Sequence, residues 1–510
     1  MTTPPNPPSL ESSLIPHFIN GHAVAGSSGR TAEVYNPATG KVQAQVALAS
    51  AAEAAQAVSA AQAAFPAWAE TPPLQRARVL FRFKELLERH AGEIAAAISA
   101  EHGKVLADAH GELTRGLEVV EFACGAPHLL KGEHSINVGR GVDSYTEYAP
   151  LGVVAGVTPF NFPCMVPMWM FPVALACGNT FVLKPSERVP SAPLILARLL
   201  QQAGLPEGVF NVLQGDRLAV DALLDDPRVQ ALSFVGSTPV AEALYARGSA
   251  LGKRVQALGG AKNHMVIMPD ADLDQAASAL LGAAFGSAGE RCMALPVVVP
   301  VGEDTAEKLK EKLLKSIAGL RIGVSNDPEA DYGPVVTPEH KARIEQWITT
   351  AEEEGAEIVV DGRGFTLQGH EKGFFVGPTL IDHVTPQMRS YQEEIFGPVL
   401  QIVRAQDFEE ALRLPSEHQY GNGVAIFTRN GHAAREFAAR VNVGMVGINV
   451  PIPVPVAYHS FGGWKRSGFG DIDQYGVEGL RFWTKNKKIT QRWPDGGGDG
   501  SNAFVIPTMG

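Results

Sequence analysis

The residue with the most reactive side-chain chemistry is Cys292, which lies in the glycine-rich stretch GSAGERCM (286–293). A thiolate is a strong nucleophile, and the adjacent Arg291 cation favours the thiolate form. A lone cysteine otherwise behaves as a small apolar side chain. That second role is expected for the three cysteines in apolar, helical surroundings, Cys124, Cys164 and Cys177. These residues alone support a nucleophile and a structural cysteine at position 292 equally.

Three further positions carry groups that bind oxyanions, phosphates or ribose. Asn161 follows an apolar run, and its amide is suited to an oxyanion or to an ordinary turn. The stretch FVGST (234–238) predicts a strand that passes into a helix, whose first N–H groups suit a phosphate, although no GxGxxG is present. Lys184 and Glu187 stand at another strand end and fit either ribose hydroxyls or a solvated surface pair.

Composition excludes several classes of function. With 43 Lys and Arg against 54 Asp and Glu, the net charge of −11 argues against nucleic-acid or anionic-membrane partners. The longest apolar stretch (165–176) is interrupted by Pro167 and Pro172, so no membrane span is expected. The histidines show no metal-ligand spacing, and GWKRSGFG is not a serine-hydrolase elbow. The start carries no targeting signal and the four cysteines form no disulfide scaffold, which favours a cytoplasmic location.

Repeated strand–helix alternation predicts the elements that position these residues. From Leu151, short β-branched runs are each followed by a helical stretch, which indicates a parallel sheet covered on both faces. Ligands bind beyond the carboxyl ends of such strands. Segments 158–161, 184–188 and 236–238 are therefore expected to border one crevice. A second α/β lobe is expected to follow.

Local signals predict several other elements. Ser50 and Glu53 form a capping box that opens a helix. The alternating stretch 144–150 predicts an edge strand of an arm, and the stretch 480–493 predicts a strand that pairs with it. Helices are expected at 74–98, 111–130, 305–316 and 338–354, a flexible tail at 1–16 and a short linker at 496–500.

Taken together, the motifs resemble the aldehyde dehydrogenase superfamily, in the family's order and over nearly the whole chain. The matching stretches are TPFNFP (158–163), VLKPSE (182–187), FVGST (234–238), LGGAK (258–262), GERCM (289–293), EEIFGP (393–398) and FGGWKRSGFGD (461–471). Three stretches point to its CoA-acylating methylmalonate-semialdehyde branch: GERCMA (289–294), PFNFPCMVPMWMFP (159–172) and IPVPVAYHSFGGW (452–464).

The resemblance implies a role for each matching position. Cys292 would be the nucleophile, and Asn161 with the Cys292 N–H would form the oxyanion hole. Arg115, otherwise a solvated helix residue, and Arg291 would hold a substrate carboxylate. Contacts to the cofactor would come from Thr158, Phe160, Lys184, Glu187, Arg188, Ser237, Glu394 and Phe396. NAD is implied rather than NADP, because an acidic Glu187 repels a 2′-phosphate.

The implied fold is α/β, with a Rossmann-type parallel-sheet cofactor domain, an α/β catalytic domain and a small β oligomerisation arm. The resemblance implies a homotetramer without a metal site. The expected divisions are the tail at 1–16, the NAD-binding domain at 17–133 and 148–257, the catalytic domain at 258–463, and the arm with the C-terminal tail at 134–147 and 464–510.

One position departs from the common family pattern. Hydrolytic members carry a glutamate in ELGGK, where this chain has Ala257 in QALGGAK. A methyl group cannot act as a general base, so coenzyme A is implied as the acyl acceptor in place of water. Glu290 lies close in sequence to Cys292, and a structural role is favoured for it over a role as the base.

The predicted reaction is the NAD- and CoA-dependent oxidative decarboxylation of methylmalonate or malonate semialdehyde, a small-molecule aldehyde, to propionyl-CoA or acetyl-CoA. Two alternatives stay open. One is a hydrolytic aldehyde dehydrogenase acting on another aldehyde, and the other is a non-catalytic structural protein that keeps the fold.

Overall fold

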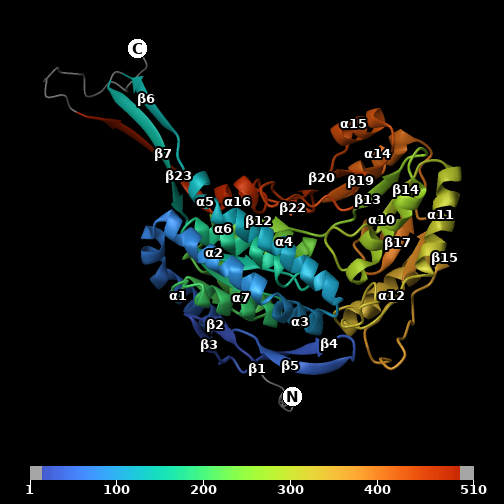
Figure 1. Ribbon diagram of the computed structural model, residues 1–510, viewed down its shortest axis with the longest axis horizontal. Helices are drawn as coiled ribbons and strands as arrows, with labels where there is room; N and C mark the ends of the chain where they lie inside the picture. Colours follow the sequence, from blue (N-terminus) through green and yellow to red (C-terminus); the bar gives the residue numbers. More distant parts are fainter. Residues whose placement is uncertain (1–13, 140, 494–510) are drawn as a thin grey trace.

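The computed structural model describes residues 14–139 and 141–493 (Figure 1). Most of the predicted tail and the predicted linker at 496–500 lie outside these residues. Leu14–Ile15, which the tail was expected to include, instead forms β1 and pairs in parallel with β5 (Lys41–Ala47). A third strand, β4 (Thr31–Asn36), completes this small sheet.

The first large sheet has eight strands in the order β22-β12-β11-β8-β9-β10-β2-β3. Its five central strands are parallel: β8 (Val153–Val157), β9 (Thr180–Lys184), β10 (Phe210–Val212), β11 (Val229–Val235) and β12 (Arg254–Leu258). Antiparallel strands close its edges: β2 (His17–Ile19), β3 (His22–Val24) and β22 (Gly468–Phe469). The strand order reverses between β8 and β11, and this switch point is where such sheets bind ligands.

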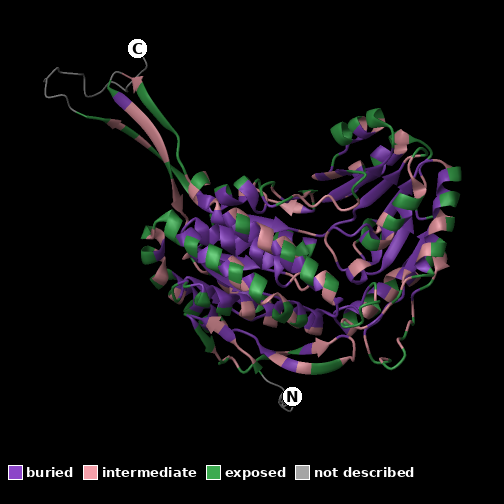
Figure 2. Ribbon diagram, in the orientation of Figure 1, coloured by how far each residue is buried: buried purple, intermediate pink, exposed green. Residues whose placement is uncertain are grey.

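Helices cover both faces of this sheet because its central strands are apolar throughout. On β9, Phe181 and Leu183 face one core and Val182 faces the other. The first face packs under α2 (Pro73–Arg89), α4 (Leu106–Cys124), α6 (Met165–Ala176) and α7 (Ser191–Gln202). The second packs under α1 (Ala51–Glu70), α8 (Arg217–Asp225) and α9 (Thr238–Ala250). In Figure 2 buried residues, in purple, run through the interior of both lobes.

The predicted capping box is confirmed, because Ser50 accepts from the Glu53 N–H and Glu53 accepts from the Ser50 N–H. The helix predicted over 74–98 is wrong as one element. It divides at His90, which leaves helical geometry, into α2 and α3 (Ala91–His102). The helix predicted from 111 instead begins at Leu106 as α4, followed by the short α5 (Ala126–Leu129).

All twelve residues of α6, the longest apolar stretch, are buried against the first sheet. It is a core helix, and it runs unbroken through the two prolines that were expected to interrupt the stretch. Of the helices that the structure describes, none has the length and apolar character needed to cross a membrane.

The predicted second α/β lobe is present as a seven-stranded sheet in the order β15-β16-β17-β14-β13-β19-β20. Its strands are β13 (His264–Ile267), β14 (Val297–Pro300), β15 (Glu357–Val360), β16 (Thr379–Asp382), β17 (Val399–Ile402), β19 (Gly423–Phe427) and β20 (Met445–Ile448). Its helices are α10 (Leu273–Phe285), α11 (Glu303–Ile317), α12 (Pro338–Glu353), α13 (Arg389–Gln392), α14 (Phe408–Glu417) and α15 (Gly431–Arg440). Helices α11 and α12 confirm the two predicted at 305–316 and 338–354.

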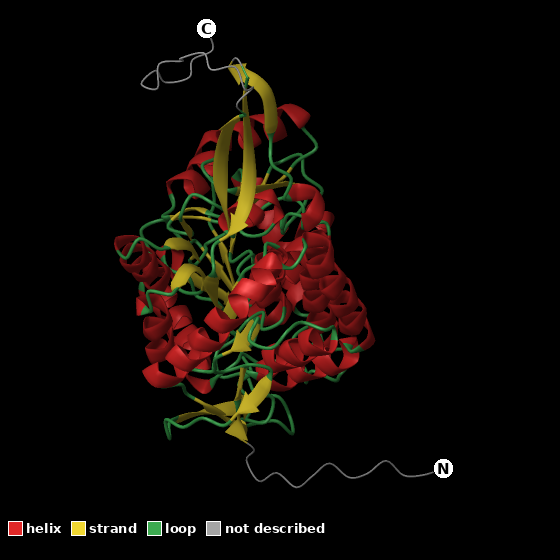
Figure 3. Cartoon of the chain, turned by 90° about the vertical axis from the view of Figure 1, so that its left-hand side faces the viewer, coloured by secondary structure: helices red, strands yellow, loops and turns green. Residues whose placement is uncertain are grey.

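A three-stranded arm projects away from both lobes (Figures 1 and 3). Its order is β23-β7-β6, with β6 at His134–Gly139, β7 at Val142–Pro150 and β23 at Thr484–Arg492. Pairing of the C-terminal stretch with the arm is confirmed. The prediction of an edge strand at 144–150 is wrong, because β7 is the central strand. The remaining elements are β18 (Tyr420–Gly421), β21 (Trp464–Lys465) and α16 (Gly476–Phe482).

All four cysteines are free thiols. Cys124, Cys164 and Cys177 are buried, as expected for apolar packing residues, and burial raises the pKa of each thiol. Cys292 alone of the four is only half-buried.

Candidate active site

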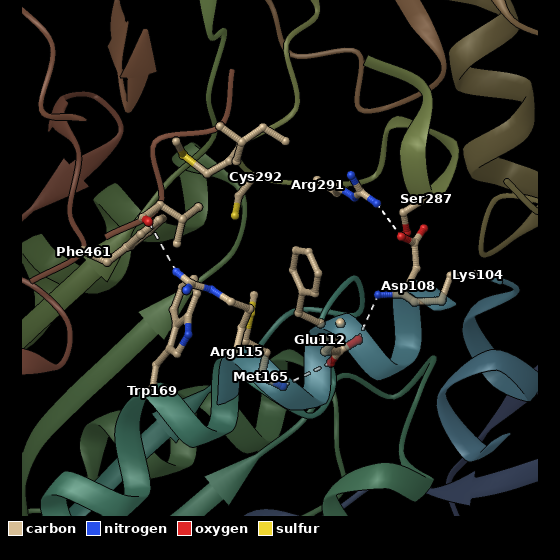
Figure 4. A pocket seen from close by; sticks show the side chains of 15 residues that line it. Lys104, Asp108, Glu112, Arg115, Met165, Trp169, Ser287, Arg291, Cys292 and Phe461 are labelled. Atoms are coloured by element: carbon tan, nitrogen blue, oxygen red, sulfur yellow. Dashed lines mark hydrogen bonds and ion pairs between the residues drawn. The ribbon is translucent and has the colours of Figure 1, made fainter. Parts of the chain in front are cut away.

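A cavity of about 410 Å³ lies between α4, α6 and the loop that carries Cys292 (Figure 4). Gly116 allows α4 to approach α6 closely, since a Cβ there would meet Met168 Cε at 2.2 Å. The polar and charged side chains that line the cavity are Lys104, Asp108, Glu112, Arg115, Ser287, Arg291 and Cys292. Its apolar wall includes Phe162, Met165, Trp169, Ile452, Val454 and Phe461.

The loop before Cys292 has an unusual backbone. Helix α10 ends at Phe285, and Ser287 and Ala288 then adopt φ values of 54° and 52°. Gly289 follows with φ 71°, and a Cβ at this position would meet the Gly397 carbonyl oxygen at 2.1 Å. The loop therefore lies directly against the segment at 396–397, with strained left-handed geometry at two non-glycine residues.

Two buried asparagines hold the backbone of Cys292. The Asn263 and Asn422 amides donate to the Cys292 carbonyl at 3.0 and 3.1 Å. The Asn263 side-chain oxygen in turn accepts from the Gly423 N–H at 2.9 Å. The nucleophile position is thus fixed through its main chain while its thiol points toward the cavity (Figure 4).

Arg291 favours the Cys292 thiolate, as expected, but burial outweighs it. Burial raises the pKa of Cys292 to about 12, and the Glu394 carboxylate raises it further, whereas Arg291 lowers it only weakly. Arg291 is itself engaged, since its Nη2 lies 2.6 Å from Asp108 Oδ1. The thiol is therefore neutral until substrate or cofactor changes its surroundings.

Asn161 is buried and does not line the cavity, but it bonds the main chain of Glu290, two positions before the nucleophile. Its Nδ2 donates to the Glu290 carbonyl at 3.1 Å, and its own carbonyl accepts from Lys104 Nζ at 2.6 Å. Lys104 also pairs with Glu112 at 2.9 Å, and Glu112 Oε1 accepts from the Cys164 N–H at 2.7 Å. A fully buried ion pair therefore fixes the segment that carries the candidate oxyanion donor.

Both predicted substrate arginines line the cavity with Cys292. Arg115 Nη1 lies 2.7 Å from Glu118, and its Nη2 donates to the Pro455 carbonyl at 2.9 Å. Arg291 Nη1 donates to the Gly282 carbonyl at 3.2 Å. The guanidinium groups are therefore held by neighbours that fix their planes.

Sequence reasoning missed Lys104, Asp108 and Glu112. Three of the cavity residues of α4, Asp108, Glu112 and Arg115, follow each other at spacings of four and three, which places them on one helical face. This spacing was available in the sequence, but charged residues on one face are usually a solvated surface. Only the packing against α6 shows otherwise.

Glu290 does not line the cavity. Its carboxyl is fully buried, accepts from the Val336 N–H at 3.3 Å and lies near His340 and His102. Burial raises the pKa of Glu290 and lowers the pKa of His340 to about 3. These contacts favour the structural role expected for Glu290.

Ala257 also does not line the cavity. It is buried in β12, where it pairs with Phe234 of β11 and Phe469 of β22. Whether a base is available to water therefore depends on the residues that line the cavity. Both carboxylates that line it are ion-paired, Asp108 with Arg291 and Glu112 with Lys104.

The predicted NAD contacts gather at the carboxyl ends of β8, β9 and β11. Lys184 is buried at the end of β9, with its Nζ 3.3 Å from Glu187. Ser237 precedes α9 without making a side-chain cap. Pro239 has no N–H and the Val240 N–H donates to the Ser237 carbonyl, so of these first residues only Thr238 offers a main-chain N–H to an anion. The Thr158 N–H donates to the Lys184 carbonyl at 3.1 Å, which joins two of these strand ends. This donor set fits a dinucleotide.

The remaining predicted cofactor residues lie close to one another. Phe160 packs edge-on against Phe396 with ring centroids 5.9 Å apart, and Arg188 lies over the Phe160 ring. The Ala261 N–H donates to Glu394 at 2.9 Å, and burial raises the pKa of Glu394 to about 7.

One group of three side chains has metal-ligand proximity, Glu357, Asp382 and His383. None of the three lines the cavity. Asp382 is already paired with Arg404 at 2.5 Å and with Lys310 at 3.0 Å. Its negative charge is therefore used within the protein.

A model of the aldehyde dehydrogenase family matches residues 24–489, and the chain belongs to that family. It is 57% identical over 493 residues to the malonate-semialdehyde dehydrogenase of Pseudomonas aeruginosa, covering 97% of this chain and 99% of the relative. It is 47% identical to the human mitochondrial acylating methylmalonate-semialdehyde/malonate-semialdehyde dehydrogenase, covering 97% and 92% of the two chains.

Solved structures agree with this assignment. The methylmalonate-semialdehyde dehydrogenase of Oceanimonas doudoroffii superposes with a TM-score of 0.93 at 61% identity, covering 94% of this chain and 99% of that chain. A Sinorhizobium meliloti protein in complex with NAD superposes with a TM-score of 0.95 at 58% identity, covering 96% and 100%.

Proposed function

We propose that the protein catalyses the NAD- and CoA-dependent oxidative decarboxylation of malonate semialdehyde and methylmalonate semialdehyde. One observation carries the proposal: Cys292 shares a cavity with two arginines, while each carboxylate lining that cavity is ion-paired. The arginines suit a carboxylated aldehyde. The paired carboxylates leave water without a base. The names of the relatives point the same way.

The first step is addition of Cys292 to the aldehyde, after its thiol has released its proton to solvent. The Cys292 sulfur bonds to the carbonyl carbon, and the oxygen becomes an oxyanion beside the Asn161 amide. Asn161 has two N–H donors, of which one bonds the Glu290 carbonyl. NAD, when bound at the ends of β8, β9 and β11, supplies the hydride acceptor. Loss of hydride leaves a thioester on Cys292.

The thioester then loses its carboxylate. The bond between Cα and the carboxylate breaks, carbon dioxide leaves, and the electron pair enters the thioester carbonyl as an enolate. The Asn161 amide is placed to stabilise that enolate oxygen, and a proton from solvent then adds to Cα. The CoA thiol attacks the acyl carbon and Cys292 leaves as a thiolate.

Identification of the product tests the proposal. Malonate semialdehyde is incubated with NAD, with and without CoA, and products are identified by mass spectrometry. We expect acetyl-CoA, with turnover falling strongly when CoA is omitted. Free acid formed equally fast without CoA would contradict the proposal and favour a hydrolytic dehydrogenase. NAD binding without activity on any aldehyde would favour a structural protein.

A second measurement tests the carboxylate contact. Arg115→Leu is expected to raise KM for malonate semialdehyde far more than for propanal, because propanal has no carboxylate to lose. Equal changes for both substrates would remove Arg115 from substrate recognition.

We also propose a homotetramer in the cytoplasm. The described arm strands carry one exposed large apolar side chain, Ile136, at 72% exposure, and a projecting three-stranded sheet needs a packing partner. The family resemblance supports four subunits. Four free cysteines are compatible with a reducing compartment.

A further inference from the structure

Each cavity arginine is already paired with a carboxylate from α4. Asp108 Oδ1 lies 2.6 Å from Arg291 Nη2, and Glu118 Oε2 lies 2.7 Å from Arg115 Nη1. Figure 4 shows the first pair at one side of the cavity and Arg115 at the other. The positive charge offered to a substrate carboxylate is therefore much smaller than two free guanidinium groups would supply.

Asp108 is the more telling of the two carboxylates, because it lines the cavity itself. Its second oxygen, Oδ2, is buried and accepts no hydrogen bond from the described residues. Asp108 makes no capping hydrogen bond to α4, although its charge in the first turn favours the helix dipole. A negative oxygen thus lies beside the guanidinium that should receive the substrate carboxylate.

We propose that Asp108 is a positioning residue that weakens the hold of Arg291 on the substrate carboxylate, so that this group can leave as carbon dioxide. The inference rests on the proposed function. Carbon dioxide is neutral, so attraction to an arginine is lost as the carboxylate departs. Contacts that stabilise only the ground state slow the step in which they are lost. An arginine whose charge is partly offset by Asp108 still orients the carboxylate, and it slows the loss of carbon dioxide less.

The acyl-enzyme has two exits. Decarboxylation first, followed by CoA attack, gives acetyl-CoA and carbon dioxide. CoA attack first gives malonyl-CoA, with the carboxylate retained and Cys292 leaving as the thiolate. The ratio of the two thioesters therefore measures how readily the carboxylate is released.

The test is Asp108→Asn, which keeps the size of the side chain and its acceptor for Arg291 but removes the charge. We expect 3-hydroxypropanoate, an unreactive analogue of malonate semialdehyde, to bind about fivefold more tightly. We also expect malonyl-CoA to appear beside acetyl-CoA. Changes in kcat and KM are expressed relative to propanal, so that a general loss of activity cancels.

Three variants serve as controls. Asp108→Glu restores the charge and should restore the wild-type product ratio. Asp304→Asn removes a similar first-turn aspartate of α11, paired with Lys308 at 2.6 Å outside the cavity, and should change nothing. Glu118→Gln removes the matching negative charge beside Arg115. It takes the place of Asp108→Asn as the test variant if thermal unfolding shows that Asp108→Asn is misfolded.

Unchanged or weaker analogue binding in Asp108→Asn, with acetyl-CoA as the only thioester, would overturn the inference. Failure of the proposed function looks different. In that case the wild-type protein itself forms no CoA thioester from malonate semialdehyde.

Discussion

At the scale of single residues, Cys292 is a neutral thiol in the free protein and not a permanently charged thiolate. Burial and the Glu394 carboxylate both favour the neutral thiol, and Asp108 occupies the nearest cation. Cys292 therefore becomes nucleophilic only when its thiol loses its proton. Its reactivity should depend steeply on pH.

Alkylation of Cys292 by iodoacetamide tests this dependence. With a pKa of about 12, the thiolate fraction at pH 7 is on the order of 10⁻⁵, and it rises about tenfold per pH unit below the pKa. The alkylation rate, followed by peptide mass spectrometry, should therefore rise steadily from pH 7 to pH 10. A plateau near pH 8 would contradict a raised pKa.

Glu394→Gln provides the matched variant. The pKa of Glu394 is about 7, so at pH 8 its carboxylate is mostly ionised and opposes the thiolate. Removing that charge should lower the pKa of Cys292 and speed alkylation at pH 8. An unchanged rate would show that burial alone sets the pKa.

At the scale of elements, the loop between α10 and Cys292 depends on one glycine. Gly289→Ala would force φ 71° on alanine and place its Cβ 2.1 Å from the Gly397 carbonyl oxygen. We expect a loss of about 1–3 kcal/mol in the free energy of unfolding. We also expect a fall of about 100-fold in the rate of the first NADH burst, because the thiol is displaced.

The control is Gly282→Ala, seven positions earlier (289 − 282) in α10, where a Cβ would meet open space. Alanine there should stabilise the protein by about 0.5–1 kcal/mol, as measured by denaturant unfolding, with the burst unchanged. Equal bursts in Gly289→Ala and in the wild-type protein would show that the loop tolerates displacement.

Elements whose signals are local could be predicted from the sequence. The apolar runs of β8, β9 and β11 predict buried parallel strands, and Ser50 with Glu53 predicts the start of a helix. The pairing of β7 with β23 was expected, but the central position of β7 was missed because no strand was expected at 134–139, where β6 pairs with its second edge. Local periodicity does not indicate which strand lies between two others.

The same distinction between local sequence signals and contacts between elements applies to the candidate site. Cys292, Asn161, Arg115 and Arg291 were found through motif resemblance. Lys104 was missed, because its contacts with Glu112 and the Asn161 carbonyl form only when α4 packs on α6.

At the scale of the whole molecule, the arm is the feature that has no function within one subunit. Deleting residues 486–510 removes most of β23 and exposes the edge of β7. We expect the proposed tetramer to break into smaller species, as measured by light scattering after gel filtration. NAD binding, measured by fluorescence titration, should persist, since its predicted contacts lie in the lobes. A stable tetramer after deletion would place the interface elsewhere.

The distribution of the four thiols also allows a thiol titration to distinguish folded from unfolded chains. Three of them are enclosed in the core beneath the first sheet, and the fourth opens to the cavity. At alkaline pH, where the Cys292 thiolate is populated, consumption of one equivalent per chain counts folded chains with an accessible cavity thiol, and consumption of four counts unfolded chains. The quality of a preparation and the occupancy of its nucleophile can therefore be read from a single colorimetric titration, before any substrate is added.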